Sequence, residues 1–230
     1  MKEVMSSSVY FGVGISLLSY IAGMSLKKRF KLSILNPLLV SIILVIAFLK
    51  AFNIDYDSYN QGGRYISFFL TPATVCLAIP LYQQLDLLKK NFKAIMLGIL
   101  TGVLTSLVGI LVLSMMFKLS HEMFVTLLPK SITTAIGIAV SDELGGIKTI
   151  TVAAIVLTGI SGNVIGEGVC RLFKIKNPIS VGLSLGTASH AIGTTKALEL
   201  GEVQGAMSSL SIAISGLITV VLAPVFAVFL

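Results

Sequence analysis

The stretch Gly186-Thr187-Ala188-Ser189-His190-Ala191-Ile192-Gly193-Thr194 is short, polar and bracketed by glycines, and it interrupts a chain that is otherwise strongly apolar. In a helix, Gly186, His190 and Thr194 would share one face, with a titratable imidazole between two small residues. Hydrocarbon offers no water to polar groups, so such a stretch persists at membrane depth only against protein or beside a cavity. We therefore expect this stretch to form part of the functional site.

The composition is that of a membrane protein. Hydrophobic residues make up 55% of the chain and charged residues 12%, with a mean hydropathy of +0.97, whereas soluble domains contain about 25% charged residues. The formal net charge of +7 comes from basic residues in short loops between apolar runs, where the positive-inside rule places them. We predict an all-α polytopic protein embedded in the lipid bilayer, without a nucleic-acid partner.

A bilayer core of about 30 Å needs about 20 apolar residues per span, and this requirement predicts eight hydrophobic segments: 8–26, 35–52, 65–82, 92–117, 124–140, 149–169, 179–195 and 206–230. Segments 35–52, 92–117, 149–169 and 206–230 are expected to be continuous helices. The segment 65–82 contains Pro72 and Pro80, the segment 124–140 contains Pro129 and Lys130, and the segment 179–195 contains the polar stretch. Because proline removes a backbone donor and glycine weakens a helix, we expect broken or re-entrant helices there.

The two halves of the chain resemble each other at an offset of about 114 residues, as in transporters built from repeats. Thr101-Gly102-Val103-Leu104-Thr105, for example, falls on Ser215-Gly216-Leu217-Ile218-Thr219. The repeat boundary near residues 117–122 predicts a first membrane repeat over 1–117 and a second over 118–230. Both repeats would belong to one integral membrane domain.

Loop charges indicate that the repeats are inverted. Lys27-Lys28-Arg29 in the first half corresponds to Ser141-Asp142-Glu143 in the second. Because lysine and arginine stay cytoplasmic, equivalent loops would face opposite sides of the membrane, and the broken helices would meet near the midplane. Inversion needs an odd number of crossings per half, and we suspect that the pair 8–26 and 124–140 contains the exception. The alternative is eight crossings with an accidental charge asymmetry.

Lys130 is the first candidate for a binding residue. A cation at a helix centre costs about 2.5–3.5 kcal/mol on insertion scales, and Ser131, Thr133 and Thr134 add hydroxyls in the same place. We interpret this group as a site for a small anion. The alternatives are a lysine that extends to the interface and a fixed structural ion pair.

Two further stretches are predicted anion sites. Thr71-Pro72-Ala73-Thr74 and Gly186-Thr187-Ala188-Ser189 read as places where a helix restarts, with free backbone N–H groups and hydroxyls at a positive dipole end. Two such ends meeting near the midplane would hold a small anion. The alternative is close helix packing through small residues.

The remaining candidates are His190, Thr194 and Asn163. His190 could bind a carboxylate when protonated or carry a proton, or it could be an interior histidine bonded across helices. Asn163 shares a helical face with Glu167, and the neighbouring glycines Gly159, Gly162 and Gly166 allow close packing instead. The sequence has no phosphate-binding glycine loop, hydrolase triad or metal cluster, so we expect no enzyme activity, cofactor or metal.

Five motifs in order resemble the LrgB/CidB family over nearly the whole chain: Asn36-Pro37-Leu38-Leu39, Thr71-Pro72-Ala73-Thr74-Val75, Leu128-Pro129-Lys130-Ser131-Ile132-Thr133-Thr134, Leu157-Thr158-Gly159-Ile160 and Gly186–Thr194. One departure is Ala135-Ile136-Gly137, where we expect a proline soon after the paired threonines. The resemblance implies a multi-pass protein of the bacterial cell membrane. It divides on function, between antiholin- or holin-like modulators of murein hydrolase activity and autolysis, and carriers of glycolate, glycerate or pyruvate.

We expect a secondary transporter or facilitator of small monocarboxylates, because the polar residues concentrate at a few helix breaks instead of lining a repetitive pore. Proton linkage is one form of this hypothesis. The rival hypothesis is an antiholin-like regulator of murein hydrolases. The resemblance implies a small LrgA/CidA-like membrane partner, and a homo-oligomer is one alternative for the assembly.

Overall fold

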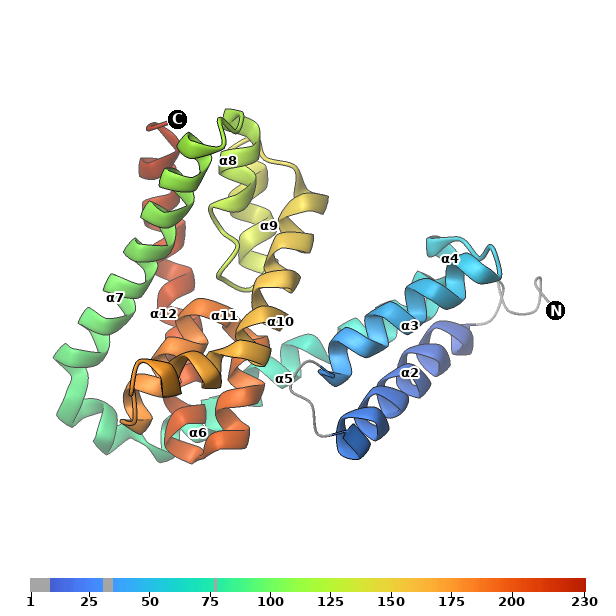
Figure 1. The fold of residues 1–230 in the computed structure, drawn as a ribbon, viewed down its shortest axis with the longest axis horizontal. Helices are drawn as coiled ribbons and strands as arrows, with labels where there is room; N and C mark the ends of the chain where they lie inside the picture. Colours follow the sequence, from blue (N-terminus) through green and yellow to red (C-terminus); the bar gives the residue numbers. More distant parts are fainter. Residues whose placement is uncertain (1–8, 31–34, 77) are drawn as a thin grey trace. The chain divides into compact units, whose positions relative to one another are not determined.

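The computed structural model describes residues 9–30, 35–76 and 78–230, and these are helical with no strand among them (Figure 1). The prediction of an all-α protein is therefore confirmed. The chain forms two compact units, which divide between Cys76 and Leu77. Each unit has its own internal packing.

The first unit contains α2 (Val9–Phe30), α3 (Pro37–Ala51), α4 (Tyr56–Phe68) and α5 (Leu70–Cys76). Asn36 begins α3, because its side-chain oxygen accepts a hydrogen bond of 2.8 Å from the Leu38 N–H and Pro37 supplies the first helical residue. The helix α3 is continuous, as expected for 35–52, but its 15 residues extend only about 22 Å. That length is short of a bilayer core.

The second unit contains α6 (Ala78–Gln83), α7 (Leu85–Met116), α8 (His121–Leu127), α9 (Thr134–Glu143), α10 (Lys148–Leu172), α11 (Pro178–Leu200) and α12 (Glu202–Ala227). Among the described residues, α7, α10 and α12 are the three helices long and apolar enough to cross a membrane. They correspond to three of the four segments predicted as continuous helices. The membrane class of the protein is thereby supported by its helix lengths.

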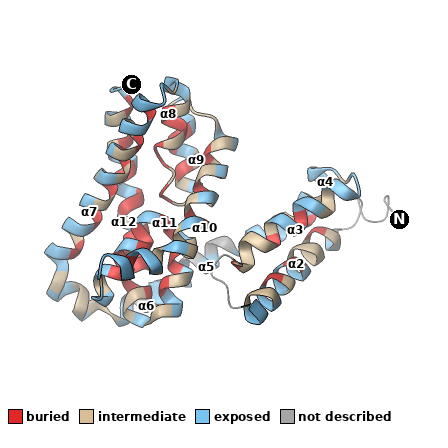
Figure 2. Ribbon diagram, in the orientation of Figure 1, coloured by how far each residue is buried: buried red, intermediate tan, exposed pale blue. Residues whose placement is uncertain are grey.

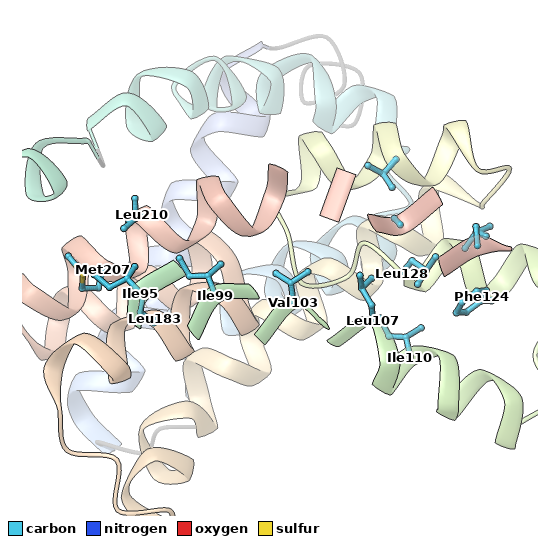
Figure 3. Packing of buried hydrophobic residues seen from close by; sticks show 14 of the residues in the cluster. Ile95, Ile99, Val103, Leu107, Ile110, Phe124, Leu128, Leu183, Met207 and Leu210 are labelled. Atoms are coloured by element: carbon cyan, nitrogen blue, oxygen red, sulfur yellow. The ribbon is translucent and has the colours of Figure 1, made fainter. Parts of the chain in front are cut away.

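The core of the second unit follows one face of α7. Ile95, Ile99, Val103, Leu107 and Ile110 recur every three or four residues and are buried, and the opposite face of α7 is exposed (Figure 2). Figure 3 shows this row with side chains of α8, α11 and α12 around it. The apolar stripe thus fixes α7 against the elements that carry the polar stretches.

The helix α11 reverses direction at Ser189 and His190, where the backbone is not helical. In a straight helix, residues 185 and 193 would lie about 12 Å apart, yet a Cβ on Gly193 would collide with the Leu185 carbonyl oxygen. The two halves of α11 therefore pack against each other as a hairpin, which we call hairpin 2 (Pro178–Leu200). This confirms the predicted break in 179–195.

A second reversal lies between α8 and α9. The Ile147 N–H, which follows α9, donates to Thr126 Oγ1 in α8 at 2.8 Å, although 21 residues of straight helix would separate them by about 31 Å. The segment 128–133 forms the turn, and we call the whole element hairpin 1 (His121–Glu143). The predicted break in 124–140 is confirmed, and α9 continues unbroken through Ala135-Ile136-Gly137.

The predicted break in segment 65–82 corresponds to two short helices, α5 and α6. Pro72 and Pro80 are each the third residue of a helix, α5 and α6, where a backbone N–H needs no intrahelical acceptor. Leu77, between these helices, lies outside the described residues.

At the offset of about 114 residues, α3 corresponds to α10 and α7 to α12, and the repeat itself stays a prediction. Of the pair suspected of containing the exception, α2 is continuous and hairpin 1 is broken, and which of them crosses the membrane stays a prediction. The boundary between the two compact units, between Cys76 and Leu77, reflects contact density and does not test the repeat boundary predicted near residues 117–122. The division at 117/118, the inversion and the meeting at the midplane stay predictions.

Candidate functional site

The second unit holds a cavity of about 580 Å³ between α7, the turn of hairpin 1 and the first half of hairpin 2. We call it the Lys130 cavity. Its polar lining comprises Thr101, Thr105, Ser106, Lys130, Ser131, Ser180, Ser184 and Thr187, and small residues complete it, among them Ala188. Four predicted site residues, Lys130, Ser131, Thr187 and Ala188, are thus brought to one cavity from two hairpins.

Lys130 is half-buried at the wall of this cavity. Its Nζ donates to Ser131 Oγ at 3.1 Å, and Ser131 Oγ lies 3.1 Å from Ser106 Oγ. Within the described ranges, no carboxylate lies within ion-pair distance of this ammonium group. An ammonium group has three N–H donors, so two remain for a ligand. This arrangement favours an anion site over the alternative of a fixed ion pair.

Thr187 provides a second donor. Its side chain is 7% exposed, and Oγ1 has no hydrogen-bond partner among the residues that the structure describes. Gly102 makes this position possible, because a Cβ there would lie 2.8 Å from Thr187 Cγ2. A buried hydroxyl without a partner is costly. A ligand oxygen in the cavity would satisfy it.

Other hydroxyls of the lining offer acceptors. Thr101 and Thr105 donate their hydroxyl protons to carbonyl oxygens one turn back, of Leu97 and Thr101, at 2.8 and 2.7 Å. Ser184 does the same toward Ser180 at 2.8 Å. With their protons used, these hydroxyls present lone pairs to the cavity. The cavity therefore has donors at Lys130 and Thr187 and acceptors on α7 and α11.

His190 does not line this cavity. Its ring Nε2 lies 3.0 Å from the Ile155 carbonyl oxygen of α10, and the ring packs over Gly159. The residue is buried and has a left-handed φ of 41°, which turns its side chain toward α10. The contact matches the alternative of an interior histidine, and its predicted roles in binding and proton transfer stay predictions.

Other predicted residues hold hairpin 2 in place. Thr194 Oγ1 lies 2.7 Å from Ser208 Oγ of α12, and Asn163 Nδ2 donates to the Ile192 carbonyl oxygen at 2.8 Å. A Cβ on Gly186 would collide with α12, and one on Gly162 with Ser189. These contacts join α10 and α12 to both halves of the hairpin.

The restart of the helix also differs in place from our expectation. Ser189 and His190 are the non-helical residues, so Gly186, Thr187 and Ala188 end the first half of α11 and do not begin the second. Thr187 is therefore a candidate anion-binding residue for a different reason than a positive helix dipole. It lines the same cavity as Lys130, and its hydroxyl has no partner among the described residues.

The last predicted residues lie outside the cavity lining. Thr133 precedes α9 and Thr134 begins it, and neither lines the Lys130 cavity. Pro72 and Ala73 belong to α5 in the first unit and are exposed, and the side chains of Thr71 and Thr74 lie outside the described residues. The meeting of this stretch with the one around Thr187 stays a prediction.

Sequence reasoning missed the hydroxyls of α7. Thr101, Thr105 and Ser106 lie in a segment that we read as plain and apolar. The i, i+4 spacing of Thr101 and Thr105 places these two on one helix face, and that pair inside a hydrophobic span was the available signal. Among the described residues, no group of His, Cys, Asp and Glu has the geometry of a metal site.

The comparisons with known proteins agree on one family. The LrgB-like family model matches residues 16–229. Proteins called antiholin-like protein LrgB, from Bacillus mycoides (strain KBAB4), Bacillus cereus (strain B4264) and Bacillus anthracis (strain CDC 684 / NRRL 3495), are 40%, 39% and 39% identical over 222 residues, 96% of each chain. No solved structure matches this chain. The chain belongs to the LrgB-like family.

Proposed function

We propose that this chain acts in the bacterial cell membrane as an antiholin-like protein, which modulates murein hydrolase activity together with a small LrgA/CidA-like membrane partner. The observation that carries this proposal is the similarity to antiholin-like relatives at 39–40% identity over 96% of both chains. The three long apolar helices support the membrane location.

The test is the rate of autolysis in a bacterium that lacks its own LrgB-like gene. Expression of this chain with the small partner should slow detergent-induced lysis relative to the empty vector. Equal lysis rates, with the protein present in the membrane fraction, would contradict the antiholin-like role.

A second candidate is the transport of small monocarboxylates, and the Lys130 cavity favours it. Among the described residues, Lys130 has no carboxylate partner and the Thr187 hydroxyl has no hydrogen-bond partner, and further hydroxyls line the same cavity. This set of groups suits an anion with a few polar atoms. The cavity volume exceeds that of a two- or three-carbon acid, which would leave room for accompanying water. The two candidates are compatible if altered carboxylate flux changes lytic activity.

Uptake of labelled pyruvate, glycolate and lactate by the purified protein in liposomes, with and without the small partner, tests the second candidate. Saturable uptake that Lys130→Ala abolishes would support a carrier. Uptake no faster than in protein-free liposomes, for all three acids and with the partner present, would rule it out.

Comparing the two assays separates the candidates. If Lys130→Ala loses uptake but still slows autolysis, the regulatory role does not depend on transport. The proton-linked form is tested by His190→Gln, which keeps hydrogen-bonding capacity without titrating near neutral pH. A flattened pH profile of uptake would support proton linkage through His190, and an unchanged profile would assign this residue to packing.

A further inference from the structure

A second, smaller cavity adjoins the Lys130 cavity within the second unit. We call it the inner cavity, and it measures about 10 Å³, room for about one water molecule. It is lined by Val103, Ser106, Leu107, Leu128, Ser131, Ile132, Thr187, Ser215 and Thr219. Ser106, Ser131 and Thr187 line both cavities, so these three side chains lie at the boundary between them.

The three boundary residues come from three different elements. Ser106 belongs to α7, Ser131 to the turn of hairpin 1 and Thr187 to hairpin 2. Ser106 and Ser131 are joined by their hydroxyls at 3.1 Å, whereas the Thr187 hydroxyl has no partner in the described part of the chain. A closure built from short hydroxyl side chains on separate elements opens with a small relative movement of one of them.

A second unpartnered hydroxyl lies farther along α7. Ser114 is 1% exposed, and its Oγ also has no partner among the described residues. It continues the buried face of Val103, Leu107 and Ile110 and lies about 12 Å beyond Ser106 along the helix axis. Buried hydroxyls are normally hydrogen-bonded, so Thr187 and Ser114 are two positions where a hydroxyl has capacity to bond a water molecule.

A bound cation is a weaker explanation of the inner cavity. A cation would coordinate the lone pairs of Thr187 but leave its proton without an acceptor, whereas water can accept that proton. The ammonium group of Lys130, which bonds to the boundary residue Ser131, would also repel a cation. Water satisfies both conditions.

We propose that the Lys130 cavity is the open half of a path through the second unit, with Ser106, Ser131 and Thr187 as its closed gate. The inner cavity and the surroundings of Ser114 form the other half, which fills with water when hairpin 1 moves away from α7. This proposal rests on the carrier candidate, because it assigns the route along which the anion leaves the cavity.

The test is the reactivity of Ser114→Cys in the full chain, reconstituted in liposomes in a Cys76→Ser, Cys170→Ala background. The probe is a charged, membrane-impermeant methanethiosulfonate, added on either side with or without pyruvate or glycolate. Without acid, Ser114→Cys should react slowly from both sides. With acid, its reaction should accelerate severalfold from the side opposite the one that labels Thr187→Cys.

Leu113→Cys is the matched control, since Leu113 precedes Ser114 on α7 but is 52% exposed on the outer face. Its reactivity should not respond to the acid. A further variant, Ser106→Cys with Ser131→Cys, should form a disulfide on oxidation, because the native hydroxyls are in contact. That bond should abolish the acid-dependent reaction of Ser114→Cys, and reduction should restore it.

Two results would overturn the gate. In the first, Ser114→Cys stays unreactive from both sides although the acid still binds in a Lys130-dependent manner. The anion site would then exist without the proposed path. The other is a reaction that the Ser106–Ser131 disulfide does not change. Absence of any Lys130-dependent binding would instead refute the carrier candidate, and the gate with it.

Discussion

Replacing Lys130 by alanine should weaken anion binding and leave the folded protein at least as stable. Lys130 donates one hydrogen bond to Ser131 at 3.1 Å and has two N–H groups left for a ligand. A charge-assisted hydrogen bond contributes about 1.5–3 kcal/mol. The loss of one such bond corresponds to a decrease in affinity of roughly 10- to 150-fold.

The effect on stability should have the opposite sign. A cation at the centre of a membrane helix costs about 2.5–3.5 kcal/mol on insertion scales. Lys130 has no carboxylate partner in the described part of the chain, and its half-exposed position reduces that cost. Alanine removes this cost, and it also removes the hydrogen bond that Lys130 donates to the uncharged Ser131 hydroxyl. The ligand-free variant should therefore unfold at the same temperature as the parent protein or at a higher one.

The assay combines calorimetric titration of pyruvate or glycolate with thermal unfolding in the same detergent. Lys176→Ala, at an exposed lysine in the loop before hairpin 2, is the matched control and should change neither. Lys130→Arg should bind more weakly than the parent protein, because a planar guanidinium presents its donors differently. Unchanged affinity in a folded Lys130→Ala protein, or a marked loss of stability, would refute the argument and assign Lys130 to structure.

Three further predictions concern packing, pH and topology. Gly162→Ala should destabilise the protein by about 1–3 kcal/mol because a Cβ there collides with the turn of hairpin 2, whereas Gly168→Ala, which meets open space, should be neutral or stabilising in chemical unfolding. A backbone N–H donated to the Asp55 carboxylate at the start of α4 lowers the pKa of that group. Its contribution should be present above the unfolded pKa of about 3.9 and lost as pH falls through the folded value, so amide exchange in α4 should accelerate there in the wild type but not in Asp55→Asn. If the repeats are inverted, cysteines at positions 28 and 142 should label from opposite sides, and labelling from one side would contradict the inversion.

The sequence by itself determined the class of the protein and the places where its helices break. Composition and loop charge are sums over the chain, so they predict a membrane protein without any knowledge of contacts. Proline and glycine act on the backbone of their own turn, so the breaks in 124–140 and 179–195 were predictable to within a few residues. Lys130 was also predictable, because an isolated cation in an apolar segment is costly wherever its neighbours lie.

Only the tertiary structure decided which residues of each break face the cavity. Helical periodicity predicts the direction of side chains only while the backbone stays helical. At His190 the backbone has a positive φ and is no longer helical, and the ring lies against the Ile155 carbonyl oxygen. Thr187, three residues earlier, faces the cavity instead. The acceptor role of Thr101 and Thr105 was equally hidden, because a hydroxyl in a helix lines a cavity only when the elements packed beside it leave space, and that space depends on contacts between residues distant in the chain.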